Sequence, residues 1–210
     1  MVRNVTCVCV VLLAAEVALG QSCPEGEWRQ WTLAEGGNGH WYRLTSVASK
    51  FDAAEAEAVA CGGHLVTIND LDENQWVLDN FVTTERWIGF YQDRNDPTYS
   101  EPRGAWKWVG HPDLCRWETT YPDHNPCYTN WWDFSPNNNG DEDWAEILSG
   151  SGGFTPGTWN DRGIASVDLL GIIERETPIP AVSTWGLVIL GILVLTGGSF
   201  LIARRRAVRA

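Results

Sequence analysis

The chain has 210 residues, a formal net charge of −12 at pH 7 and 13 tryptophans. Its length allows one medium-sized domain with accessory segments. The acidic balance argues against nucleic acid as a partner, because phosphate binding needs a basic face. The tryptophans are numerous enough for a large aromatic core, and indole rings also form flat apolar surfaces on which sugars stack. The composition leaves both uses open.

The two ends of the chain have the composition of targeting segments. Residues 1–20 combine a positive start at Arg3, an apolar run and a small-residue exit, which predicts a secretory signal peptide. Residues 186–203 form an apolar run long enough to cross a bilayer as a helix, and an arginine-rich end follows. Because positive residues stay on the cytoplasmic side, we expect the C-terminus inside and the preceding domain exported, at the cell envelope or surface.

Between these ends, the pattern first predicts two helices. Residues 49–60 are rich in Ala and Glu, with Ser49 as the expected cap and a Gly-Gly pair as the stop. A strand is expected over 64–68. Asp70 and Glu73 form a capping box that begins a second helix. Its expected apolar face consists of Leu71, Trp76, Leu78 and Phe81.

Short strands separated by long loops follow the helices. We expect the strands over residues 86–91, 105–109, 144–148, 158–161 and 171–174, and an irregular stretch rich in Pro, Asn, Asp and Trp over 110–140. Two helices followed by short strands predict an α+β fold. Long loops without regular structure are usually functional.

Two separate clusters of amide and carboxylate oxygens are the strongest functional signal. Asn137, Glu142 and Asp143 lie in and just after a Pro/Asn/Gly loop, and Asn160 and Asp161 follow a tryptophan further on. Hard cations such as Ca2+ take roughly six to eight oxygen ligands, more than either cluster supplies alone. The sequence predicts a calcium site if a sheet brings the clusters together. The competing interpretation is an Asn/Asp-rich loop that only satisfies its own turns.

The order of the motifs resembles the C-type lectin-like fold over roughly residues 38–175. The matching motifs are GGHLVTIN at 62–69, WIGF at 87–90, GAWKW at 104–108, YTNW at 128–131, SPNN at 135–138, ED at 142–143 and WND at 159–161. The expected organisation is then a signal peptide (1–20), an N-terminal extension (21–37), the lectin-like domain (38–176), a linker with a sorting motif (177–185), a transmembrane helix (186–203) and a cytoplasmic tail (204–210).

The resemblance implies a Ca2+ site made by Asn137, Glu142, Asn160 and Asp161, next to a cis proline at Pro136. It also implies that two vicinal sugar hydroxyls bind the ion directly while the same side chains hydrogen-bond them. One departure concerns Ser135, which stands where the family has Glu or Gln. A hydroxyl is a poorer ligand than a carboxylate, so we expect weaker calcium binding, with Ser135 as an additional candidate ligand. The resemblance further implies an auxiliary calcium site, with Asp93, Glu101, Asn138 and Asp143 as approximate matches.

Four cysteines remain after a signal peptide is removed, and an exported domain favours disulfides. Cys115 with Cys127 would close a short loop and is the favoured pair, and Cys23 with Cys61 is the second. The two bridges typical of the family are not reproduced, so an aromatic core must hold the fold. In an alternative interpretation, two cysteines and two histidines form a zinc site, although their spacing matches no common finger: His111, Cys115, His124 and Cys127.

The sequence IPAVSTWGL at 179–187 resembles the signature of bacterial C-terminal sorting tails of the IPTL-CTERM type. That resemblance implies recognition by a membrane sorting protease.

Three classes of function are open. The first is a cell-surface, Ca2+-dependent binder of carbohydrate or glycoconjugate. The second is a protein-binding or structural envelope domain of the same fold with a weak or empty calcium site, for which a surface protein is the partner. The third is an enzyme with paired carboxylates. The sequence contains no serine-hydrolase, zinc-protease or phosphate-loop motif, so we expect no enzyme and favour the carbohydrate binder.

Overall fold

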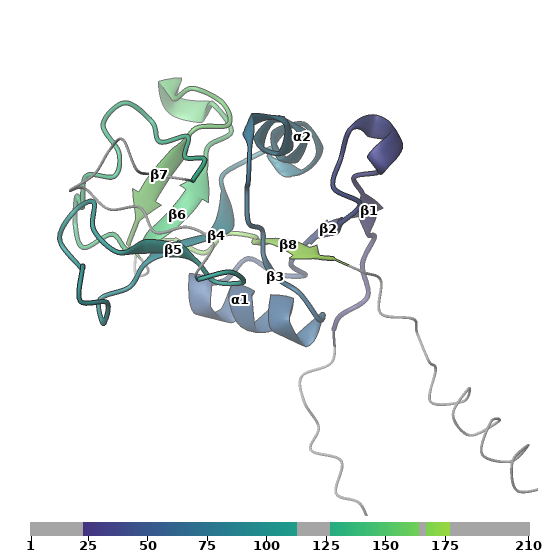
Figure 1. The fold of residues 1–210 in the computed structure, drawn as a ribbon, viewed down its shortest axis with the longest axis horizontal. Coiled ribbons are helices and arrows are strands. Elements are labelled where there is room, and N and C mark those ends of the chain that lie inside the picture. Colours follow the sequence, from purple (N-terminus) through teal and green to yellow (C-terminus); the bar gives the residue numbers. More distant parts are fainter. Residues whose placement is uncertain (1–22, 113–126, 164–166, 177–210) are drawn as a thin grey trace, which may run out of the picture. The chain divides into compact units, whose positions relative to one another are not determined.

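The computed structural model describes residues 23–112, 127–163 and 167–176. They form an α+β fold, as predicted, in which two helices accompany two four-stranded antiparallel sheets (Figure 1). Among the described helices, none is long and apolar enough to cross a membrane. The expected signal peptide, sorting motif, transmembrane helix and arginine-rich tail all lie outside the described residues.

The first sheet joins the beginning and the end of the described chain. Its strand order is β1-β2-β8-β3, with β1 at Arg29–Gln30, β2 at Trp41–Leu44, β8 at Ile172–Arg175 and β3 at His64–Leu65. The sequence did not predict β1 and β2. The ladder of β3 is shorter than expected, but the backbone N–H of Val66 still donates to Ile172 O at 2.8 Å.

The second sheet carries the residues of interest. Its order is β5-β4-β6-β7, with β5 at Trp106–Trp108, β4 at Arg86–Gln92, β6 at Trp144–Ile147 and β7 at Trp159–Arg162. In the register of β6 with β7, Glu146 lies opposite Asn160. A parallel bridge between Trp131 and Trp159 brings the long loop alongside β7. The sheet thus places a distant loop next to the WND motif.

Helix α1 (Phe51–Ala60) lies close to its predicted position, but its expected cap is wrong. Lys50 is the N-cap, and its side chain makes no capping hydrogen bond. Ser49 instead exchanges two backbone hydrogen bonds with Leu169, at 2.9 and 3.0 Å. This bridge holds Ser49 in extended backbone outside the helix. The helix ends before Gly62, whose φ of 74° is the left-handed conformation that glycine adopts readily.

Helix α2 (Leu71–Phe81) begins at Asp70, as predicted. The backbone N–H of Glu73 donates to Asp70 Oδ1 at 2.8 Å, whereas the Glu73 carboxylate accepts from the N–H of Asn69 rather than from that of the cap. The expected apolar face is wrong at Leu71, which is 62% exposed at the first turn. Val77 is buried, and Trp76, Leu78 and Phe81 pack against the core.

An aromatic core supports the site, and this is one of the two uses that the tryptophan count left open. Trp87, Trp106, Trp108 and Trp159 are fully buried. Phe90 packs against the last three of these, with ring centroids 4.5 to 5.9 Å apart. The indole N–H of Trp159 donates to Asn74 Oδ1 at 2.8 Å, so burying this ring leaves no indole donor unsatisfied.

A disulfide links Cys23 to Cys61 and fastens the N-terminal segment to the end of α1. Cys127 is also disulfide-bonded, while Cys115, its expected partner, lies outside the described residues. A disulfide-bonded Cys127 is not a thiolate ligand, which counts against the zinc alternative. The His111 ring lies edge-on to that of His64 at 5.1 Å, and His124 is not among the described residues.

Candidate metal and ligand site

The two predicted oxygen clusters meet at β7. The backbone N–H groups of Asn137 and Asn138 both donate to Asp161 Oδ2, each at 2.7 Å. The peptide bond between Ser135 and Pro136 is cis. The Asp161 carboxylate on the sheet therefore holds the loop of residues 135–142. The two clusters, which are distant in sequence, are adjacent in the fold.

Asp161 is the chemical centre of this site. Its side chain is fully buried, and burial raises its pKa. Oδ2 accepts the two loop hydrogen bonds, whereas the buried Oδ1 accepts none of comparable geometry among the described residues, although the Ser135 hydroxyl and the backbone N–H of Asp161 lie near enough to the carboxylate to lower its pKa in part. A buried carboxylate oxygen without a donor is costly. A cation coordinated at Oδ1 would remove that cost.

Glu142 brings a second negative charge to the site. Burial and then the charge of Asp161 raise the pKa of Glu142 to about 7. Within the described chain, its Oε2 accepts the backbone N–H of Asn139 at 3.0 Å. Two carboxylates that repel each other match the donor chemistry of a divalent cation.

Asn160 is oriented from both sides. Its Oδ1 accepts from the hydroxyl of Ser135 at 2.7 Å, and its Nδ2 donates to Glu146 Oε1 at 3.1 Å and to Asp161 O at 2.7 Å. The Ser135 side chain is thus directed at Asn160. Its contact supports an orienting role for the serine in the place where the family has a carboxylate or amide ligand.

Sequence reasoning missed Glu146 and Arg162. Glu146 is fully buried, and Arg162 binds its Oε1 through Nε at 2.8 Å and through Nη2 at 2.6 Å. The sequence did contain a signal for this pair, namely a glutamate inside the apolar strand WAEI. Charged residues are seldom buried without a partner, so this glutamate predicts a nearby cationic side chain. Arg162 pairs with Glu146 and leaves the carboxylates of Asp161 and Glu142 without an ion pair in the described chain.

The residues proposed for an auxiliary calcium site contact other partners. Asp93 pairs with Lys107, Glu101 with the hydroxyl of Tyr99, and Asn138 Oδ1 accepts from the N–H of Glu142. Asp143 Oδ2 accepts from Arg94 Nε at 2.6 Å, and Arg94 also contacts Asp141. Arg94 already pairs with one oxygen of the buried Asp143, and the auxiliary calcium site stays a prediction.

A cavity of about 630 Å3 opens beside Arg94 and is lined partly by Tyr91, Asp141 and Trp144. Its lining does not include the four predicted ligands. Among the described residues, no three His, Cys, Asp or Glu side chains converge on one point. At the candidate site the carboxylates of Glu142 and Asp161 would need amide and backbone oxygens to complete a cation shell.

Three comparisons place this geometry among known proteins, and no protein-family model matches the chain. A perlucin-like protein of Mytilus galloprovincialis is 24% identical over 169 residues, covering 78% of this chain and 89% of that protein. The human scavenger receptor C-type lectin carbohydrate-recognition domain is 26% identical with a TM-score of 0.51, covering 74% of this chain and 100% of that domain. A calcium-independent type II antifreeze protein is 23% identical with a TM-score of 0.51, covering 73% of this chain and 93% of the other.

The chain therefore has the C-type lectin-like fold that its motifs indicated. None of these three names denotes an enzyme, in agreement with the expectation from the sequence. One name specifies carbohydrate recognition and another specifies independence from calcium. Proteins with this fold therefore differ in function, and the function of this chain has to be argued from the residues of its site.

Proposed function

We propose that this chain is an exported, cell-surface-anchored domain that binds carbohydrate in a Ca2+-dependent manner. The observation that carries the proposal is the Asp161 carboxylate, which is buried at the junction of loop and sheet with one oxygen unpaired among the described residues. Glu142, with its raised pKa, lies close enough for the two charges to repel. A bound cation would stabilise this arrangement, because it would offset the repulsion between the two carboxylates.

Asn137, Glu142, Asn160 and Asp161 would hold the ion. Bound calcium would supply open coordination positions for two neighbouring sugar hydroxyls. The Glu142 carboxylate would supply an acceptor and the Asn137 amide a donor for the same hydroxyls, because both N–H groups of Asn160 already donate to Glu146 Oε1 and Asp161 O. The hydrogen bond from Ser135 fixes the Asn160 amide, so its Nδ2 faces Glu146 and its oxygen faces the loop.

An alternative function is a protein-binding or structural envelope domain with a weak or empty calcium site. Ser135 favours it, because the loop lacks the carboxylate or amide ligand that the family has there. The similarity to a calcium-independent protein is also compatible with it. The apolar run and arginine-rich end at 186–210 support membrane anchoring in either case, and the motif at 179–187 supports handling by a sorting protease.

A glycan array probed with the purified full-length chain in detergent separates the two functions. We expect signals in millimolar Ca2+ that vanish in EDTA and return when Ca2+ is restored. Binding to glycans that survives EDTA would remove the calcium dependence from the proposal. Binding to protein ligands alone, insensitive to EDTA, would favour the alternative.

A further inference from the structure

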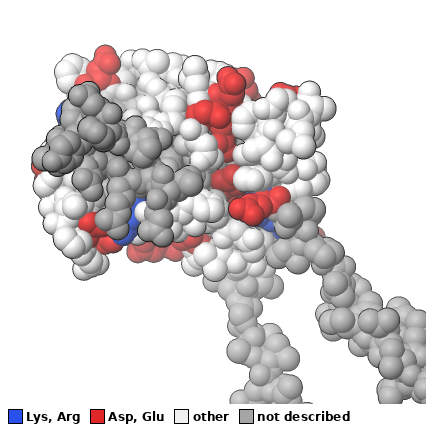
Figure 2. Space-filling view, in the orientation of Figure 1, with Lys and Arg blue, Asp and Glu red and all other residues white. Residues whose placement is uncertain are grey.

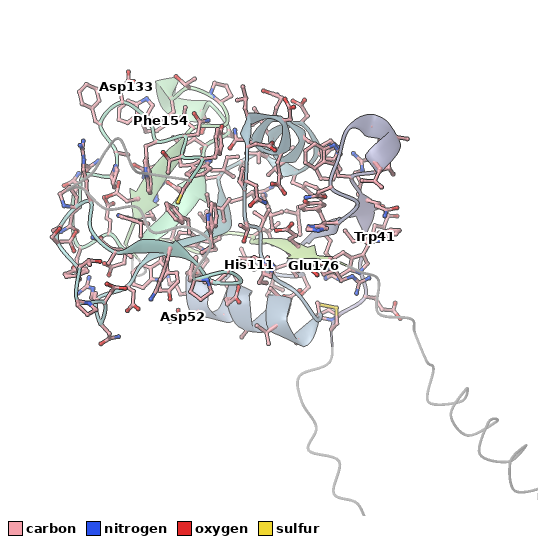
Figure 3. All side chains as sticks on the ribbon, in the orientation of Figure 1. Trp41, Asp52, His111, Asp133, Phe154 and Glu176 are labelled. Atoms are coloured by element: carbon pink, nitrogen blue, oxygen red, sulfur yellow. A yellow bond between two sulfur atoms is a disulfide. The ribbon has the colours of Figure 1, made fainter. Side chains whose placement is uncertain are left out.

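Three aromatic side chains cluster beside the candidate site. The Trp132 ring lies 5.2 Å from that of Phe134 and 4.9 Å from that of Phe154, both edge-on. We call these three residues the aromatic patch. Phe134 is 71% exposed, so most of its ring meets solvent. Figure 3 shows Phe154 and Asp133, the residue between the two loop aromatics, at the same end of the molecule.

The aromatic patch is built on the backbone that carries the candidate ligands. Phe134 directly precedes Ser135, whose hydroxyl orients Asn160. The N–H of Trp132 donates to Trp159 O at 2.8 Å, and Trp159 directly precedes Asn160. The backbone of the patch is therefore continuous with Ser135 and is hydrogen-bonded to the residue that precedes Asn160.

The position of the patch distinguishes it from the other exposed hydrophobic side chains. The other large exposed hydrophobic residues among those described are aliphatic and lie on different elements: Leu33, Val47, Val59 and Leu71. Such single exposed residues are ordinary on protein surfaces. Three rings in contact next to a candidate ligand site are a local feature that needs an explanation.

The size and charge of the patch limit what it can bind. A stable protein interface covers about 800 Å2 on each partner. Three aromatic side chains bury roughly 150–250 Å2 each even when they are fully covered, so the patch alone is too small for such an interface. Trp132 and Phe154 are already half-buried. The face in Figure 2 carries many more Asp and Glu than Lys and Arg, which disfavours an anionic lipid surface. An uncharged ligand about the size of one sugar ring remains.

We propose that the aromatic patch is a stacking subsite, in which the Phe134 ring receives a second pyranose residue of an oligosaccharide. This inference rests on the proposed function, because the first sugar residue must be held at Asn137, Glu142, Asn160 and Asp161. The C–H groups on one side of a pyranose ring would pack on the face of Phe134, whose ring packs edge-on against Trp132, while Phe154 packs against the same tryptophan. The ligand class is therefore an oligosaccharide rather than a single sugar.

The test compares short and longer sugars by isothermal titration of the full-length chain in Ca2+. The probes are methyl α-mannoside with mannotriose, and methyl β-galactoside with galactobiose. We expect the longer member of one pair to bind more tightly than its monosaccharide. Phe134→Leu should reduce that oligosaccharide affinity about 3- to 10-fold and leave both the monosaccharide and the calcium affinities unchanged. Phe134→Tyr should retain the wild-type values.

Leu33→Ala serves as the control, since it removes a side chain that is 77% exposed on another element. Equal affinities for the short and long probes, with no effect of Phe134→Leu, would overturn the subsite and leave the proposed function standing. An equal loss for both probe lengths would place Phe134 in the primary site and refute the subsite. Failure of every sugar to bind would refute the proposed function and the subsite with it. Self-association that Phe134→Leu abolishes would assign the patch to a second copy of the chain.

Discussion

A buried pair of glutamates should make the stability of this protein depend on pH. Glu73 on α2 and Glu174 on β8 are 1% and 2% exposed, and both lie within hydrogen-bond distance of the Tyr42 hydroxyl, at 2.7 and 3.2 Å. Burial, followed by the charge of Glu174, raises the pKa of Glu73 from 4.5 to about 7. His40 contacts Glu174 at 2.7 Å, and that hydrogen bond raises the pKa of the imidazole.

The direction in which the free energy of unfolding changes with pH follows from proton binding. Between pH 4.5 and 7 the folded protein keeps a proton on Glu73 that the unfolded chain releases, so the free energy of unfolding falls as pH rises through this window. At about 1.4 kcal/mol for each pH unit, the loss is at most about 3.5 kcal/mol. His40 acts in the same direction, because its stabilising charge is present below 6.5 and is lost as pH rises through its higher folded pKa.

Glu73→Gln mimics the protonated acid and should remove this dependence. Urea unfolding of the full-length chain at pH 5, 6, 7 and 8 measures it. We expect the stability difference between the variant and the wild type to shift in the variant's favour by about 2–3 kcal/mol between pH 5 and pH 8. Asp72→Asn, which changes an exposed acid in the same helix, is the control. Parallel pH profiles for wild type and Glu73→Gln would show that Glu73 is ionised in the folded protein at all these pH values, and the reasoning would fail.

Three further perturbations test the structure away from that pair. Arg94→Met leaves the buried Asp143 unpaired, and a thermal melt should show a loss of about 1–2 kcal/mol after allowance for the exposure of Arg94; a melt like that of Arg103→Met would show that the guanidinium contributes nothing. Cys61→Ser removes the disulfide between residues separated by 38 positions, and denaturant unfolding should show that the free energy of unfolding falls by about 3–4 kcal/mol. An unchanged wild-type unfolding curve in dithiothreitol would contradict this prediction. Trp159→Phe strands the buried Asn74 Oδ1 and should cost about 1–3 kcal/mol, and an unchanged unfolding midpoint would count against that hydrogen bond.

The helices and the second sheet were predictable because their signals are local. Asp70 caps α2 with its own side chain, and Gly62 ends α1 through a conformation that few other residues adopt. The contact between the loop and Asp161 was not local. The two oxygen clusters predicted it on the condition that a sheet brings them together, and the resemblance of the motifs to a known fold implied such a sheet. The loop residues 137 and 138 meet Asp161 through their backbone N–H groups, which every non-proline residue carries.

The missed features depend on partners that are distant in sequence. Strand β2 contains Arg43, a poor residue for a buried strand until Glu57 on α1 supplies its counter-charge at 3.3 Å. Asp143 belonged to an acid-rich motif that suggested a metal, yet its counter-charge is Arg94, far earlier in the chain. Sequence patterns identify acids readily, but they do not show whether an arginine or a metal ion neutralises them.

Calcium binding by Asp161→Asn tests the central claim most directly. The Asn side chain can still accept the two loop N–H groups, so the change removes the charge and keeps the anchor. Asp133→Asn, an exposed acid on the same loop, is the control. We expect millimolar Ca2+ to raise the melting temperature of the wild type and of Asp133→Asn, EDTA to reverse the rise, and Asp161→Asn to show no rise at all. A wild-type melting temperature that calcium does not change, or a calcium-induced rise that persists in Asp161→Asn, would contradict the account.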